Sequence, residues 1–455
     1  MSFRTNLVRA RGHIVFLVAL VLGLCLVLWL ERLGQMPVAD TTADEQQIQI
    51  APNAEWEQDL MATFENVDPL PLDIRGLSSV KDLDDAKIAW KYFQNNTDPV
   101  TGLVNSANNY PSTTMWETGS YLIAVLAAER LGLIDASEAE SRIGKVLDSL
   151  KKIRLFDDML PNKAYNTRTL ELVDYTNKPS AKGLGWSALD IARIIASFGL
   201  VERNHPDLAP KVEDVMDGWK LSEMVKDGEL WGANVREGKT VENQEGRVGY
   251  EQYAAKAMML FGYDMYRAYE VRDNLMIKEV DGEPIPVDSR MHRGVTPAFV
   301  VSEPYLFDGL EFGFDARSQR FATAVYKAQE ARYERTGQLT AVTESHLNVA
   351  PYFAYATVWG GGAPWAVLSF AGDRMDSKRT LATKAAYAWN ALFGTDYTRK
   401  LVAGVASTAD PEKGFAEGIY ETDGTLNTSI TANTNSVVLS SLAFKLDGPL
   451  MRAVK

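Results

Sequence analysis

Helical segments of two kinds alternate along most of this chain. Four segments are rich in Ala, Ser, Leu and aromatic residues, namely 113–131, 185–198, 249–269 and 433–446. Three others carry regularly spaced charges, namely 137–152, 205–226 and 317–336. A helix that is apolar on all sides is buried, whereas a helix with one apolar face covers a core. Over about 370 residues, this alternation predicts a double ring of helical hairpins, roughly sixty residues each if there are six.

We therefore predict an all-α domain with an (α/α)6 toroid fold over residues 79–455. Further helices are expected at 79–93, 351–359, 377–393 and 397–406. Beyond residue 79 we find almost no alternation of polar and apolar residues, so few strands are expected. An open helical solenoid is the alternative, but that fold would need a clearer internal repeat.

An apolar run at residues 14–30, IVFLVALVLGLCLVLWL, follows Arg4, Arg9 and Arg11. At about 1.5 Å per residue, a helix of this run reaches roughly 25 Å, the short end of a bilayer span. We predict a cytoplasmic stub at 1–13, a transmembrane anchor at 14–30 and a polar tether with a docking segment at 31–78. The expected location is the inner membrane, single-pass, with the toroid in the periplasm. A cleaved signal peptide is the alternative.

Charge and rare residue types exclude several classes of function. The net charge of −13 argues against a nucleic-acid partner, because neutralising phosphates requires clustered Lys and Arg. The single thiol, Cys25, excludes an internal disulfide. None of the four histidines stands at the spacing of a zinc or iron site, so we expect no metal and no cofactor, although a carboxylate calcium site stays open.

The predicted buried helices begin with aromatic, carboxylate and amide residues. In a toroid, the starts of the inner helices meet at one end of the ring, which predicts one cleft. Flat aromatic faces bind the C–H faces of sugars, and carboxylates and amides bind hydroxyl groups. Most aromatic residues of a large core serve packing instead. The candidates for substrate binding are Trp116, Glu117, Trp186, Asp190, Tyr250, Tyr253, Tyr420, Glu421 and Asn435.

Glycoside hydrolysis requires two carboxyl groups, whose separation decides the stereochemical outcome. Glu251 or Glu245 is our candidate for the general acid, with Glu344 or Glu421 as the base that activates water. If a helix starts near residue 249, Glu251 extends its buried face, where desolvation raises a carboxyl pKa and the helix N-terminus lowers it. Inversion is the working expectation. Helix capping or a surface ion pair would explain the same carboxylates equally well.

Several motifs together resemble the bacterial DUF3131 family, a domain of unknown function. They lie between about Ala86 and Leu446 and read TGLVNSANNYPSTTMWETGSYLIAVLAAERLGLI, LPNKAYNT, GLGWSALDIAR, QEGRVGYEQYAA, TESHLNVAPYFAY and YETDGTLNTSITANTNSVVLSSLAF. More loosely, the pattern is similar to (α/α)6-toroid glycoside hydrolases of the glucoamylase-like and β-1,2-glucan-degrading groups. The resemblance implies an extracytoplasmic protein of polysaccharide metabolism.

The leading hypothesis is a glycoside hydrolase that acts on a bacterial glucan or exopolysaccharide, with β-1,2-glucan as one candidate. Its expected partners are a polysaccharide or oligosaccharide and, through residues 14–30, the inner membrane. A non-catalytic polysaccharide-binding or export-assembly protein is the alternative. A polysaccharide lyase is a third hypothesis. Lyases need positive charge to neutralise the uronate, whereas the candidate cleft is acidic.

Overall fold

The computed structural model describes residues 54–76, 79–292 and 296–452. Residues Gln58–Lys455 form one compact unit, and the description below concerns that unit. The chain upstream of residue 54, including the predicted stub, anchor and most of the tether, lies outside the described residues.

The helices are α2 Ala54–Glu65, α3 Val80–Asn96, α4 Met115–Arg130, α5 Ala136–Leu150, α6 Ala188–Asn204, α7 Ala209–Met216, α8 Tyr250–Met259, α9 Tyr266–Tyr269, α10 Glu303–Phe307, α11 Ala316–Thr336, α12 Thr383–Phe393, α13 Asp396–Gly404 and α14 Ala432–Asp447.

The strands are β1 Ser112–Thr113, β2 Tyr165–Asn166, β3 Val225–Lys226, β4 Glu229–Arg236, β5 Lys239–Gln244, β6 Leu275–Val280, β7 Glu283–Asp288, β8 Met291–His292, β9 Thr296–Pro297, β10 Glu344–His346, β11 Phe353–Ala356, β12 Trp359–Gly360, β13 Ala363–Pro364, β14 Val367–Leu368, β15 Thr380–Ala382, β16 Ala409–Asp410, β17 Gly414–Tyr420 and β18 Leu426–Ile430. They pair antiparallel in small separate sheets, among them β3-β4-β5, β6-β7, β10-β11-β14 and β15-β17-β18.

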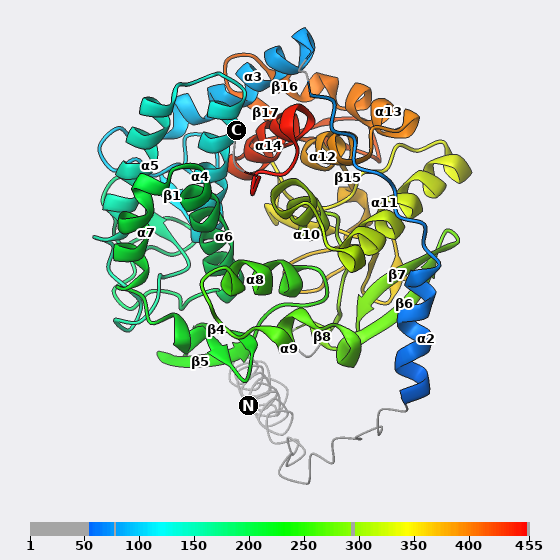
Figure 1. Ribbon diagram of the computed structural model, residues 1–455, viewed down its shortest axis with the longest axis horizontal. Coiled ribbons are helices and arrows are strands. Elements are labelled where there is room, and N and C mark those ends of the chain that lie inside the picture. The colour runs from blue at the N-terminus through cyan, green and yellow to red at the C-terminus, as the bar shows by residue number, and fades with distance from the viewer. Residues whose placement is uncertain (1–53, 77–78, 293–295, 453–455) are drawn as a thin grey trace, which may run out of the picture. The chain divides into compact units, whose positions relative to one another are not determined.

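Alternate helices form an inner ring, visible around the centre of Figure 1. Its members are α4, α6, α8, α10, α12 and α14, and each packs against the next, with α14 packing back against α4. The helices between them, α3, α5, α7, α9, α11 and α13, lie outside this ring, and α9 is a single turn. The predicted (α/α)6 toroid is therefore confirmed.

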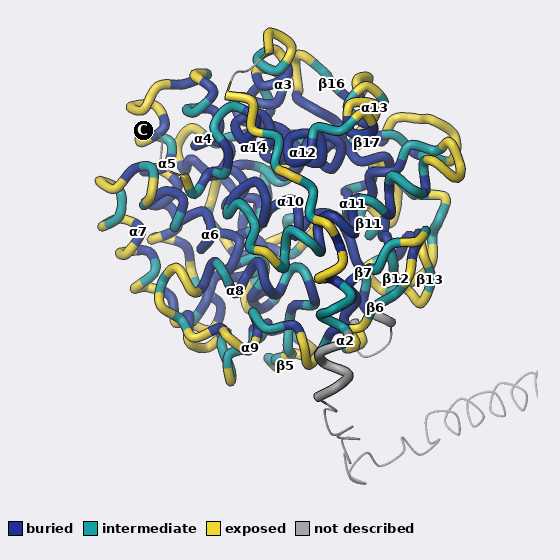
Figure 2. Tube along the Cα trace, turned by 45° about the vertical axis from the view of Figure 1, so that its right-hand side comes forward, coloured by how far each residue is buried: buried dark blue, intermediate teal, exposed yellow. Residues whose placement is uncertain are grey.

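Burial separates the inner helices from the outer ones, as Figure 2 shows. Every residue of α12 is buried, and so is nearly all of α4 and α14. The outer helix α5 instead buries one face, through residues such as Ile143, Val146 and Leu150, and exposes the other. The two kinds of helix expected from composition thus take the two expected positions.

Hydroxyl caps begin three of the inner helices. The side chain of Thr114 accepts a hydrogen bond from the backbone N–H of Trp116 at 3.1 Å and so caps α4. Ser187 caps α6 through the N–H of Asp190 at 3.2 Å, and Thr431 caps α14 in the same way. A capping hydroxyl satisfies one of the free N–H groups of the first turn. Because each cap fixes where its helix starts, it also fixes which side chains stand at that end of the ring.

A buried ion pair lies among the inner helices. Arg193 from α6 donates to Glu311, which follows α10, at 2.6 Å, and both side chains are 1% exposed. The hydroxyl of Tyr253 donates to Glu311 at 2.7 Å, and the Arg193 guanidinium stacks 4.0 Å from the ring centre of Phe307. Burial lowers the pKa of Arg193, but the Glu311 and Tyr253 charges outweigh it and raise that pKa. The inner helices are therefore joined by a buried, charged and hydrogen-bonded cluster.

The expectation of few strands is wrong for the connections between helices. Residues 351–359, predicted as helix, contain strand β11, in which partly exposed Phe353 and Tyr355 alternate with buried Ala354 and Ala356. A two-residue period of burial is typical of a strand. The Ala and Tyr residues of this segment had suggested a helix instead.

Two predicted helices are also shorter than expected. The helix predicted at 249–269 ends at Met259, because the chain turns at Gly262, whose φ of +81° suits glycine, and resumes only as α9. Within 205–226 the only α-helix is α7.

The predicted single-pass location in the inner membrane is not supported, and we withdraw it. Among residues 54–76, 79–292 and 296–452, no helix combines the length and the apolar composition needed to cross a bilayer.

Candidate active site

Acidic side chains gather where the inner helices begin. Glu117 lies in the first turn of α4, Asp190 in that of α6 and Glu303 in that of α10. Two connections add Glu344 from β10 and Glu417 from β17. These residues come from five separate parts of the chain, and the pKa shifts below show that their charges act on one another. We call the end of the ring where the inner helices begin the mouth. The five acidic residues and Lys384 of α12 are the mouth cluster.

Glu344 has the most perturbed environment in the mouth cluster. Burial, together with the charges of Glu303 and Asp190, raises the pKa of its carboxyl to about 8, against the opposing effects of Lys384 and of the Tyr250 hydroxyl. The residue as a whole is nevertheless partly exposed. A carboxyl group in this state holds a proton near neutral pH, as a general acid must.

Asp190 is the second strongly shifted carboxyl. Burial, together with the charges of Glu245 and Glu117, raises its pKa to about 8, while Ser187 and Lys163 oppose the shift. The Ser187 hydroxyl lies 3.1 Å from Asp190 Oδ1. Asp190 is partly exposed as well. Two carboxyl groups whose charges act on each other titrate as a coupled system, so ionisation of one favours protonation of the other.

Glu245 lies beside Asp190 as a cap on α6. Its carboxylate accepts from the Ser187 hydroxyl and from the backbone N–H of Ala188, both at 2.7 Å. A side chain at Gly232 would leave no room for this carboxylate, because a Cβ there would lie 2.1 Å from Glu245 Oε2. The glycine therefore allows the hairpin β4–β5 to deliver Glu245 to the helix start.

Lys384 is the cation of the mouth cluster. It forms an ion pair with Glu303, and both side chains are almost fully buried. Asn433, from the first turn of α14, donates to the other Glu303 oxygen at 2.8 Å. Burial lowers the pKa of Lys384, but Glu303, Glu417 and Glu344 outweigh it and raise that pKa. Lys384 thus stays charged and partly compensates three carboxylates.

Glu117 and Glu417 occupy the α4 and α14 side of the mouth. Glu117 accepts a short hydrogen bond from the Thr114 hydroxyl. Glu417 accepts from Thr431 at 2.5 Å and from Thr434 at 2.7 Å, and its second oxygen is buried without a hydrogen-bond partner. Both charges contribute to the raised pKa of Tyr92, after burial. An unsatisfied buried carboxylate oxygen is unusual and is typical of a functional site.

Two aromatic side chains stand among these carboxylates. Trp116 and Tyr250 are both partly exposed and meet edge to face, with ring centres 5.7 Å apart. Burial, followed by the charges of Glu344 and Glu303, raises the pKa of Tyr250 well above its ordinary value. Its hydroxyl therefore keeps its proton and can donate a hydrogen bond.

Glu251, the first sequence candidate for the acid, lies in a different cluster. Arg290 pairs with its carboxylate at 2.5 Å, and Gln244 donates to it at 2.9 Å. Burial raises the pKa of Glu251, against the effect of Arg290, with Asp288 and Glu229 as its other charged neighbours. None of the carboxylates that shift its pKa belongs to the mouth cluster.

The other predicted residues fall into two groups. Trp116, Glu117, Asp190, Tyr250, Glu245 and Glu344 come together at the mouth. The rest serve contacts elsewhere: the Trp186 indole is fully buried and donates to the Trp231 carbonyl, Tyr253 belongs to the Arg193 cluster, Tyr420 donates to Asn348, Glu421 pairs with Arg332 and Arg379, and Asn435 bonds the backbone of Phe415.

Sequence reasoning did not single out Glu303 and Lys384. Glu303 precedes Pro304 at the start of α10, and Pro in the first turn is a recognised helix-start signal. Because α10 has only five residues, its periodicity was too short to detect. Lys384 was visible as a lysine in an otherwise buried Ala-rich helix, which is rare unless the charge is paired.

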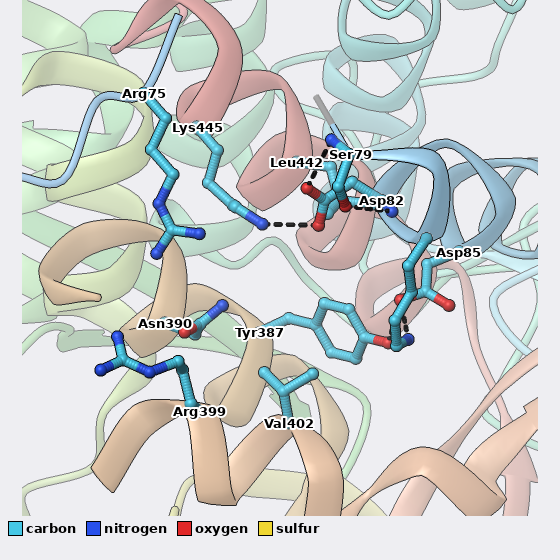
Figure 3. A pocket seen from close by; sticks show the side chains of 11 residues that line it. Arg75, Ser79, Asp82, Asp85, Tyr387, Asn390, Arg399, Val402, Leu442 and Lys445 are labelled. Atoms are coloured by element: carbon cyan, nitrogen blue, oxygen red, sulfur yellow. Dashed lines mark hydrogen bonds and ion pairs between the residues drawn. The ribbon is translucent and has the colours of Figure 1, made fainter. Parts of the chain in front are cut away.

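A cavity of about 280 Å³ lies elsewhere, where α12 and α14 end and α3 begins (Figure 3). Its charged side chains face one another: Lys445 pairs with Asp82 at 2.5 Å and Lys81 with Asp85 at 2.6 Å. Inner helices contribute their later residues to this cavity, such as Lys445 of α14, whereas the mouth cluster uses their first turns. The cavity is therefore separate from the mouth. In the described part of the chain, no group of three or more His, Cys, Asp or Glu side chains could hold a metal ion.

The fold and the mouth together define an (α/α)6-toroid protein with an acidic, aromatic site at the start of its inner helices. The chain belongs to the DUF3131 family, described as proteins of unknown function, whose model matches residues 84–448. A search of curated proteins gives no significant match.

Solved structures with a similar fold include glucan-degrading enzymes. The endo-β-1,2-glucanase of Chitinophaga pinensis has a TM-score of 0.59 at 12% identity, covering 82% of this chain and 94% of the other. The β-1,2-glucanase of Parabacteroides distasonis has 0.57 at 15%, covering 82% and 57%. A Bacteroides caccae protein provisionally assigned as a glucoamylase has 0.58 at 13%, covering 82% and 95%. At these identities the likeness establishes the fold.

Proposed function

We propose that this protein is a glycoside hydrolase that cleaves a neutral glucan, with Glu344 as the general acid and Asp190 as the base that activates water. The observation that carries the proposal is the pair of partly exposed acidic residues at the ring mouth, whose carboxyl groups each have a pKa of about 8. Glycoside hydrolysis needs one protonated and one ionised carboxyl group on either side of the scissile bond.

The charges around the pair support this assignment of roles. The Asp190 charge is one of the influences that raise the pKa of Glu344, so an ionised Asp190 reinforces protonation of Glu344. Lys163 and the Ser187 hydroxyl oppose the raised pKa of Asp190, so the ionised form that the base role requires becomes increasingly populated as the pH approaches about 8. Glu344 would donate its proton to the glycosidic oxygen, and Asp190 would take a proton from the attacking water.

A neutral sugar polymer fits the rest of the mouth. Trp116 and Tyr250 offer partly exposed aromatic surface, and the surrounding carboxylates accept hydrogen bonds from hydroxyl groups. A uronate polymer would bring further negative charge to a site that already contains five carboxylates. β-1,2-Glucan is the first substrate to test, because two fold relatives are β-1,2-glucanases.

The test is product analysis with the purified protein. It is incubated with β-1,2-, β-1,3- and α-linked glucans and with uronate polymers, while reducing ends and the absorbance of unsaturated products are followed. Reducing ends without unsaturated products support hydrolysis, and Asp190→Asn should then reduce turnover by about 10²–10⁴-fold. Unsaturated products would indicate a lyase instead. Binding without any product would favour the non-catalytic polysaccharide-binding protein.

A further inference from the structure

We infer that one face of strands β10 and β11 binds successive sugar units of a linear, neutral oligosaccharide that leads away from Glu344. This inference rests on the proposed function and specifies how its substrate is held. The inference implies that the enzyme acts on linear glucan chains rather than on disaccharides.

The register of the two strands brings an aromatic surface next to the proposed acid. Glu344 pairs with Tyr355, and His346 pairs with Phe353. All four residues are partly exposed, and the residues between them along each strand are buried. Because side chains alternate across a strand, these four lie on the same face of the sheet.

The rings on this face form a continuous row. The ring centres of Phe299 and Tyr355 are 4.3 Å apart, those of Tyr355 and Phe353 are 5.2 Å apart, and those of Phe353 and His346 are 5.2 Å apart. Each of the four side chains keeps part of its surface exposed. We call these four residues the aromatic row.

The row is continuous with the mouth cluster. Tyr355 is the cross-strand neighbour of Glu344, and its charge is one of the influences on the pKa of Tyr250, after burial and the nearby glutamates. A ligand on the row therefore continues directly into the site of Glu344. Neighbouring rings of the row meet edge to face or tilted rather than stacked. Exposed aromatic rings bind the C–H faces of sugar rings, and the acidic mouth beside them disfavours anionic ligands. The fitting occupant is a neutral glycan of several sugar units.

The connection that carries the row is held in place by a neighbouring hairpin. Asn427 of β18 is fully buried, and its side chain donates to the carbonyl of His346 at 2.7 Å and accepts from the N–H of Asn348 at 3.1 Å. The Tyr420 hydroxyl donates to the Asn348 side chain at 2.7 Å. A surface fixed in this way loses little conformational entropy when a ligand binds.

The test measures binding to the Glu344→Gln variant, which should bind without turnover. Calorimetry with linear β-1,2-linked glucose oligosaccharides, from the disaccharide to the hexasaccharide, should give an affinity that rises with chain length. Adding Phe353→Ala should weaken hexasaccharide binding about tenfold, the value of one aromatic contact of roughly 1.4 kcal/mol, and leave disaccharide binding within about twofold.

Three further variants separate stacking from folding. Phe353→Tyr keeps the ring and should bind like its parent, whereas Phe353→Leu keeps an apolar side chain without a ring and should behave like Phe353→Ala. Tyr266→Ala, on the outer helix α9, removes another exposed aromatic ring and should change nothing. Thermal unfolding checks that each variant is folded.

Two outcomes would overturn the proposal that the aromatic row binds the oligosaccharide. One is an affinity that does not depend on chain length, and the other is a Phe353→Leu variant that binds the hexasaccharide like its parent. Neither depends on turnover, so failure of the row is distinguishable from failure of the proposed function. If the unmodified protein releases no reducing ends but its affinity still rises with oligosaccharide length, the hydrolase proposal fails and the binding role of the aromatic row is supported.

Discussion

Replacing Glu344 by Gln should abolish turnover and at the same time stabilise the folded protein at alkaline pH. The carboxyl has a pKa of about 8 in the folded state, against an ordinary value of 4.5. One pKa unit corresponds to about 1.36 kcal/mol, so ionising Glu344 destabilises the folded state by roughly 4–5 kcal/mol, an upper value because its neighbours titrate with it. A neutral amide of the same shape removes this contribution.

The sign follows from proton binding. Below pH 4.5 the carboxyl is protonated in both the folded and the unfolded state, so its ionisation does not change the free energy of unfolding. As the pH rises from 4.5 through about 8, the unfolded chain releases the proton first, so the folded state loses stability until both states are ionised. The unmodified protein should therefore lose more stability between pH 5 and pH 9 than Glu344→Gln does.

The assay is denaturant unfolding at a series of pH values, together with initial rates on the best glucan. Glu421→Gln is the matched control, because the Arg332 and Arg379 charges outweigh burial and lower the pKa of Glu421. Ionised Glu421 stabilises the folded state above the ordinary pKa of a glutamate, and this stabilisation is lost as the pH falls through the lowered pKa. Glu421→Gln should therefore be less stable than the unmodified protein at neutral pH. Parallel pH-stability curves for Glu344→Gln and the unmodified protein would refute the reasoning.

Three further changes test the surroundings of the mouth. Gly232→Ala should displace the Glu245 carboxylate from its α6 cap, lowering the free energy of unfolding by about 1–3 kcal/mol and also lowering the rate. Gly144→Ala is the control: its Cβ would lie 3.6 Å or more from its neighbours inside α5, so thermal unfolding should show no loss of stability and a gain of up to about 1 kcal/mol. Glu311→Gln should leave a buried guanidinium unpaired and lower the free energy of unfolding by about 3–5 kcal/mol, and an unchanged denaturation midpoint would contradict this. Glu251→Gln should retain turnover within about tenfold, since its carboxylate pairs with Arg290; a loss of 10²–10⁴-fold in initial rate would move the acid role to Glu251.

The double ring was predictable because inner and outer helices differ in composition over many residues. Small and apolar residues prevail around Ile194 of α6 and Leu439 of α14, and helices of this composition are buried. Short elements were not predictable, because a five-residue helix such as α10 contains barely more than one turn of pattern. Strand β11 was mistaken for a helix since Ala and Tyr occur in both.

The site was only partly predictable, because sequence gives the neighbours of a residue along the chain but not across space. Glu117 and Asp190 lie in the first turns of α4 and α6, and carboxylates were expected from the sequence at the starts of the buried helices. Glu251 pairs with Arg290, which lies 39 residues away along the chain, and not with the groups around Glu344. No local pattern announces such a partner.

The central claim is that Glu344 and Asp190 act on opposite sides of a glycosidic bond at the ring mouth. The most direct test is a crystal structure of the Glu344→Gln variant with a bound linear glucan oligosaccharide. Our account predicts a glycosidic oxygen within hydrogen-bond distance of the side chain at position 344, and a water or open space between the sugar and Asp190. A sugar chain bound in the cavity of Figure 3, or at the mouth with no glycosidic oxygen near position 344, would contradict it.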